Sequence, residues 1–92
     1  MGKLANLREL EKPLKALANK WRLAILQYLK RKKETPVNEI AREIKLSIKA
    51  TSKHLLILSA LGIIESNQRS LQVFYHIVEA QTPSVHPIIS LL

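Results

Sequence analysis

The sequence predicts a mainly α-helical domain that carries one small β-hairpin. Apolar residues recur every three or four positions as far as Gly62, which is the period of an amphipathic helix. From Leu71 to Ile77 the period changes to two, which is the period of a strand. The 92 residues, 47% of them hydrophobic, suffice for one modest core. We therefore expect a single domain over residues 1–92.

The first two helices are predicted from an apolar stripe and from the asparagine that follows it. Apolar spacings of three and four favour an N-terminal helix over residues 1–18. Proline is costly in a helix interior, so we expect a kink or a restart near Pro13. Asn19 is a suitable N-cap for a second helix from Lys20 to about Lys33. The apolar stripe consists of Leu4, Leu7, Leu10, Leu14, Leu17 and Trp21.

Two short helices joined by a tight turn are predicted next. After a chain break at Pro36, apolar residues at positions i, i+3, i+4 and i+7 predict a helix of two turns from Val37 to Ile44. A very short turn separates this helix from Ser47, a good N-cap for a further helix that ends near Gly62. This arrangement, over residues 37–60, is a helix-turn-helix.

A β-hairpin over residues 63–77 and a short tail complete the chain. The polar run from Asn67 to Ser70 is the expected turn between the two strands. Pro83 and Pro87 exclude a long regular helix from the C-terminal tail, residues 78–92.

Composition and charge narrow the classes of function. Fifteen Lys and Arg against seven Asp and Glu give a formal net charge of +8. This charge favours a polyanionic partner, such as nucleic acid or an acidic membrane. The alternative is that the charge serves solubility alone. The absence of cysteine excludes disulfides and thiolate metal sites. No signal peptide and no apolar run of ~18 residues is present, so we expect a soluble cytoplasmic protein.

The segment LSIKATSKHLLIL, Leu46 to Leu58, is cationic at its front and apolar at its back. On a helix, Leu55 and Leu58 lie on one side and the two lysines on the other, so the outer face is basic only in its first two turns. A helix that enters the major groove of DNA needs this distribution, whereas a solvated face with two ordinary lysines is the alternative. The candidate DNA contacts are Ile48, Lys49, Thr51, Ser52 and Lys53.

From Leu14 to Ile77 the chain resembles the winged helix-turn-helix regulators of the arsenical-resistance-repressor (ArsR) type. The resemblance covers two thirds of the chain without gaps. The matching runs are LKALANKWRLAIL from Leu14 to Leu26, EIAREIKLSIKATSKHLLIL from Glu39 to Leu58, and LGIIES…VFYHI from Leu61 to Ile77.

The resemblance implies four helices followed by a two-stranded wing, and assigns roles to individual residues. Ser47 to Ala60 is then the recognition helix and Ile64 to Ile77 the wing. Arg69 falls at the wing tip, where a basic side chain reaches the adjacent minor groove or backbone, and Arg22 is a structural or phosphate-facing residue. The positions that face DNA in the family are occupied by Ile48, Lys49, Ser52, Lys53 and His54.

Three departures from the family pattern affect the turn geometry and the wing. Glu65 stands at a wing position that is often basic, and it would weaken attraction to phosphate. Ser70 replaces the usual wing glycine, so we expect Asn67 to adopt a positive φ there. Lys45 replaces the glycine of the helix-helix turn, at a cost of roughly 1 kcal/mol if it is left-handed.

Metal sensing, which is frequent in this family, is not expected here. Pro36 and Asn38 occupy the positions of the family's Cys-X-Cys pair and offer no thiolate. The family's second site, on its final helix, would retain only Glu79 and His86. A tetrahedral metal site needs about four ligands on a compact frame, so we expect neither a metal nor a cofactor.

The expected function is that of a dimeric repressor that binds double-stranded DNA with sequence specificity. The candidate dimer seam is the leucine stripe within residues 1–18, the N-terminal dimerisation helix, together with the apolar C-terminus; the alternative is that both close the monomer's own core. A winged-helix protein-interaction module without specific DNA binding is the main alternative function, and an N-terminal helix on a membrane surface is a third. We expect no enzyme, because no catalytic triad, phosphate loop or carboxylate pair stands out.

Overall fold

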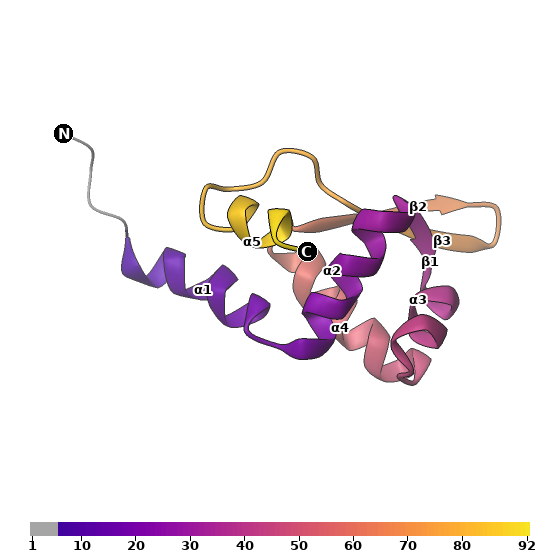
Figure 1. Ribbon diagram of the computed structural model, residues 1–92. Coiled ribbons are helices and arrows are strands. Elements are labelled where there is room, and N and C mark those ends of the chain that lie inside the picture. The colour runs from indigo at the N-terminus through magenta and orange to yellow at the C-terminus, as the bar shows by residue number, and fades with distance from the viewer. Residues whose placement is uncertain (1–5) are drawn as a thin grey trace.

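The computed structural model describes residues 6–92 and, within them, five helices and a three-stranded antiparallel sheet. Figure 1 shows α2, α3 and α4 gathered beside the hairpin, while α1 extends away from them toward the N-terminus. The predicted winged helix-turn-helix class is confirmed. The elements are α1 (Leu7–Leu17), α2 (Lys20–Lys32), β1 (Glu34–Pro36), α3 (Val37–Ile44), α4 (Ile48–Ala60), β2 (Ile64–Arg69), β3 (Gln72–Ile77) and α5 (His86–Ser90).

Helix α1 runs without interruption through Pro13, so, of the expected kink or restart, the restart is wrong. The side-chain oxygen of Asn6 accepts hydrogen bonds from the backbone N–H groups of Arg8 and Glu9 at 3.1 and 3.3 Å and begins the helix. Proline removes one helical donor, but Glu9, whose carbonyl loses its partner, is exposed to water. Leu4, the first member of the predicted stripe, lies outside the described residues.

Both N-caps predicted from the sequence are confirmed. Asn19 accepts hydrogen bonds from the N–H groups of Trp21 and Arg22 at 3.0 and 3.1 Å, and α2 begins at the next residue. The hydroxyl oxygen of Ser47 accepts one from the N–H of Ala50 at 3.0 Å at the start of α4. Each cap satisfies backbone donors that have no partner within their own helix.

The turn between α3 and α4 is left-handed at Lys45, with φ 59° and ψ 48°, so the condition attached to the cost of this lysine is met. The N–H of Leu46 donates to the carbonyl of Ala41 at 3.0 Å, which closes the last turn of α3. Gly62, with φ 71°, ends α4 as expected. Lys45 sets the direction in which the chain passes from α3 into α4. Gly62 sets the direction in which it passes from α4 toward β2.

Strand β1 was not predicted; a break was expected at Pro36 instead. Its residues pair antiparallel with β3, Thr35 lying opposite Tyr75, and the strand order is β1-β3-β2. A proline is tolerated there because β1 is an edge strand, where one backbone donor can be absent. The central strand of the wing therefore has a partner on both sides.

The turn of the hairpin begins three residues later, and is shorter, than the sequence suggested. Arg69 pairs with Gln72, so Ser70 and Leu71 form the turn. Ser70, with φ 57°, supplies the positive φ that was assigned to Asn67, and that assignment is wrong. Asn67 instead lies within β2, opposite a residue of β3.

One cluster of buried side chains unites the helices, the hairpin and the tail. The Tyr28 hydroxyl donates to Glu39 Oε2 at 2.6 Å, which joins α2 to α3 and, together with burial, raises the pKa of Tyr28 to about 12. Lys30 Nζ donates to the last carbonyls of α5 and fixes the tail. The cluster comprises Leu17, Ile25, Leu26, Tyr28, Leu29, Ile40, Ile44, Leu55, Leu58, Ile63, Ile64 and Val85.

Candidate nucleic-acid interface

The outer face of α4 is basic and accessible in its first two turns. Lys49, Ser52 and Lys53 are exposed, and Ile48 is 54% exposed. The opposite side of the helix contributes fully buried residues to the core. Since the same helix is anchored on one side and open on the other, its lysines and hydroxyl stand on a rigid element.

Thr51, however, is fully buried, so the prediction that it contacts DNA is wrong. It lies one turn before Leu55, on the core side of α4. Its Oγ1 has no hydrogen-bond partner among residues 6–92. A buried hydroxyl without a partner destabilises the fold by roughly 1–3 kcal/mol.

Thr51→Val is therefore expected to leave DNA binding unchanged and to raise the free energy of unfolding by about 1 kcal/mol, because valine removes the unsatisfied hydroxyl and keeps the branched shape. Urea denaturation compares the variants, with exposed Ser52→Ala as a control that gains no such stabilisation. A large loss of duplex affinity in Thr51→Val would restore the original assignment.

His54, half-buried on the same helix, is held by Arg22. Arg22 Nη1 lies 3.2 Å from His54 Nδ1, and Arg22 Nε donates to the carbonyl of Ala16 at 2.5 Å. Because arginine can only donate, Nδ1 accepts, and the proton of the neutral ring sits on Nε2. Arg22 is thus structural, and Nε2 remains the donor that His54 can offer to a phosphate.

Burial, and after it the charge of Arg22, lowers the pKa of His54. The folded state therefore disfavours the protonated ring, and stability falls as the pH drops through the unfolded value of 6.5 toward the lower folded pKa. His54→Asn keeps an acceptor for Arg22 but cannot titrate. Urea midpoints measured between pH 7 and pH 5 should fall less in His54→Asn than in the unmodified chain. An equal fall in the two proteins would contradict this assignment.

The wing does not present Arg69 as a free cation. Its guanidinium forms an ion pair with Glu34 of β1 and lies over the ring of Phe74, 4.9 Å from its centroid. The tip itself consists of Ser70 and Leu71, and Leu71 is 98% exposed. The hairpin extends at the same end of the molecule as α3 and the first turns of α4 (Figure 1).

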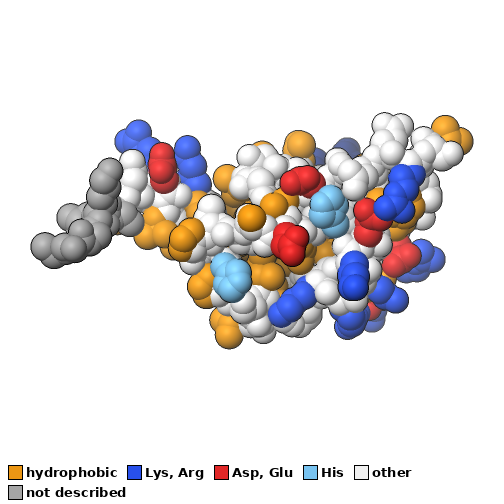
Figure 2. Space-filling view, turned by 90° about the horizontal axis from the view of Figure 1, so that it is seen from above, with side chains coloured by type: hydrophobic (Ala, Val, Ile, Leu, Met, Phe, Trp, Pro, Cys, Tyr) orange, Lys and Arg blue, Asp and Glu red, His pale blue; other side chains and the backbone are white. Residues whose placement is uncertain are grey.

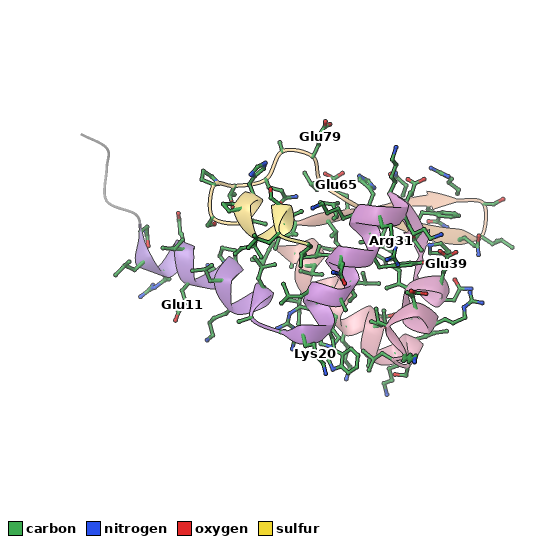
Figure 3. All side chains as sticks on the ribbon, in the orientation of Figure 1. Glu11, Lys20, Arg31, Glu39, Glu65 and Glu79 are labelled. Carbon is green, nitrogen blue, oxygen red and sulfur yellow. The ribbon has the colours of Figure 1, made fainter. Side chains whose placement is uncertain are left out.

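Two of the acidic side chains lie on a different side from these first turns. Glu65 and Glu79 lie toward the top of the view in Figure 3, whereas the start of α4 lies at the bottom. Seen from above, acidic and histidine side chains are visible in the middle of the molecule, and further acidic side chains lie beside Lys and Arg toward its two ends (Figure 2). Glu65 Oε2 is 4.0 Å from His76 Nε2. The expected local repulsion by Glu65 thus concerns the base of the wing rather than its tip.

A cleft of about 940 Å³ opens between α2, β3 and α5. Glu65, His76, Glu79 and His86 are among its lining residues. Within residues 6–92, no three His, Cys, Asp or Glu side chains are grouped closely enough to hold a metal ion. No helix in this part of the chain has the length and apolar character that crossing a bilayer requires.

A second surface, on α1, is apolar. Leu7 is 77% and Leu14 41% exposed, and together with Leu10 they line a shallow groove of about 350 Å³. Only the end of α1, at Ala16 and Leu17, is buried against the body. The stripe predicted from the sequence therefore remains largely uncovered over the described part of α1.

Comparison with known proteins places these features in context. A family model described as "Helix-turn-helix domain" matches residues 17–67. A search of curated protein sequences found no match. Reduced HlyU from Vibrio cholerae is 33% identical, with a TM-score of 0.78, and the match covers 95% of this chain and 87% of that one.

Two further solved structures extend the comparison. The transcriptional repressor PagR of Bacillus anthracis is 29% identical, with a TM-score of 0.75, over 92% of this chain and 93% of that one. A homodimeric winged helix-turn-helix DNA-binding domain from Mycobacterium bovis, a possible ArsR-family transcriptional regulator, is 26% identical, with a TM-score of 0.76, over 99% and 85% of the two chains.

Proposed function

Because the chain belongs to the helix-turn-helix domain family, we propose that it is an ArsR-type transcriptional repressor that binds specific sequences in double-stranded DNA as a homodimer. The observation that carries this proposal is the outer face of α4. It bears Lys49, Ser52 and Lys53 in its first two turns, while the side that bears Leu55 and Leu58 is fixed in the core. A helix that reads a major groove needs both properties.

In the proposed complex, α4 lies in the major groove and the wing lies beside the adjacent minor groove. Lys49 and Lys53 contact phosphates or guanine edges, Ser52 and His54 Nε2 donate to phosphate, and Ile48 lies against a thymine methyl. Lys45, exposed in the left-handed turn before α4, adds positive charge at the same end. The first N–H groups of α4 favour phosphate further.

The dimer is proposed to form through α1. The uncovered leucines of α1 would be buried against the same surface of a second copy, as in a two-fold interface. Such a dimer reads two half-sites about 34 Å apart, one turn of the duplex. The homodimeric relative from Mycobacterium bovis supports this assembly by analogy.

Selection of bound fragments from random duplexes tests the proposal. We expect a palindromic consensus, followed by a steep loss of affinity for that duplex as salt rises, since phosphate contacts release counterions. Recovery of unrelated sequences, or binding that is indifferent to salt, would contradict the proposed function.

A protein-interaction module without specific DNA binding is the second candidate, and one observation favours it. Leu56 is 70% exposed on the trailing half of α4, and its neighbour Ile57 is also exposed. An apolar patch of this kind suits a protein partner better than a duplex. This candidate predicts that duplex binding is weak and independent of salt.

A further inference from the structure

The tip of the wing carries an apolar side chain where a cation was expected. Leu71 is 98% exposed, although a single exposed leucine is by itself ordinary on a protein surface. What distinguishes Leu71 is its support. The turn is closed by the pairing of Arg69 with Gln72, Ser70 holds the left-handed conformation, and β3 is paired on both sides. The leucine therefore stands on an ordered hairpin.

The positive charge of the wing is paired rather than free at this tip. Arg69 is the only lysine or arginine from Ile64 to Ile77. Its guanidinium is engaged by the carboxylate of Glu34 and by the ring of Phe74. Asn67 Nδ2 also donates to Glu34, at 3.4 Å. Glu34 of β1 thus binds two polar side chains of the wing, those of Arg69 and Asn67.

Beyond the ion pair of Arg69 with Glu34, the side chains at the tip are neutral. Gln72 directly follows the turn of Ser70 and Leu71, Gln68 directly precedes Arg69, and both glutamines are exposed. Proteins that bind the minor groove combine such groups, since Asn and Gln read the groove edges while a leucine or another apolar side chain lies against sugars or between base steps. Contacts of this kind neutralise no phosphate and release no counterion.

We propose that Leu71 is a specificity-determining residue that contacts the minor groove of A·T-rich DNA at the outer flank of each half-site. This inference rests on the proposed function and adds the chemistry of the wing to it. The wing then contributes affinity that does not depend on salt, whereas α4 contributes affinity that does. The preference for A·T arises because the amino group of guanine projects into the minor groove and obstructs an apolar side chain.

The test measures binding of Leu71→Ala to the selected duplex over a series of salt concentrations. We expect affinity to fall by about tenfold at every salt concentration, because a buried apolar contact is lost, while the slope of log affinity against log salt stays unchanged. Leu61→Ala is the control: an exposed leucine at the C-terminal end of α4 and outside both proposed interfaces, whose loss should leave affinity unchanged.

Base substitution in the flank supplies a second readout. Replacing flanking A·T pairs by G·C should weaken binding of the unmodified chain, and replacement by inosine·C, which lacks the amino group in the minor groove, should restore it. Leu71→Ala should respond little to either change.

The failures of the two proposals are distinguishable. If the unmodified chain binds its duplex with steep salt dependence and Leu71→Ala binds equally well, the role of Leu71 is wrong and the proposed function stands. A reduced salt slope in Leu71→Ala would also overturn the role, since it would indicate lost phosphate contacts. If the unmodified chain selects no duplex at all, both proposals fall.

Discussion

Replacing Lys49 and Lys53 together by alanine is expected to weaken binding to the selected duplex ~30-fold per protomer at 0.15 M salt. Each lysine that contacts a phosphate contributes a slope of about 0.9 in log affinity against log salt, and two such contacts correspond to that factor at this concentration. The slope itself should fall by about 1.8 per protomer. Both residues are exposed on α4, so the fold should be retained, as circular dichroism would show.

A matched control separates local contact from overall charge. Lys12→Ala with Lys32→Ala removes the same charge from exposed positions on α1 and at the end of α2. This pair should lower affinity slightly, through long-range attraction alone. Equal losses from the two double variants would mean that net charge, rather than the outer face of α4, governs binding.

The second large effect is expected at the dimer seam. Leu7→Glu combined with Leu14→Glu should convert a dimer of twice 10.5 kDa to a monomer at micromolar concentration, as measured by sedimentation. The two leucines are seven residues apart on one face of α1 and are already partly in water, so the monomer fold should persist. Four carboxylates would meet in the two-fold interface and repel one another.

Loss of the dimer should also weaken operator binding by about 10²–10⁴-fold, because the second half-site is then no longer bound intramolecularly. Leu56→Glu combined with Leu71→Glu is the control for oligomeric state: it adds the same two charges at exposed leucines outside α1 and should remain dimeric. A double variant that still sediments at twice 10.5 kDa would place the seam elsewhere.

Local signals in the sequence were sufficient for the first four helices and for the short turn between α3 and α4, whereas α5 was not predicted. Asn19 and Ser47 are caps whose partners lie two or three residues away, so their effect can be inferred from neighbouring residues alone. The conformation of Lys45 follows from the same short range. Strand β1 escaped prediction because three residues ending in a proline carry no period.

The candidate site was predicted less completely, because its contacts are distant in sequence. Arg22 and His54 are 32 residues apart, and Glu34 and Arg69 are 35 apart, so no spacing rule connects them. The periodicity of α4 already placed Thr51 with Leu55 on the core side, and its hydroxyl was misread as a contact to phosphate. The DNA contacts of Lys49, Ser52 and Lys53 remain predictions.

The two bonds of Arg22 have a mechanical consequence. The guanidinium of Arg22 donates to the carbonyl of Ala16, near the end of α1, and lies beside the ring of His54, two turns into α4. Arg22 thereby links the end of α1 to α4 through one side chain. In the proposed dimer on DNA, a tilt of either helix would disturb this guanidinium, so the position of α1 in the dimer would be coupled to the position of α4 on the duplex.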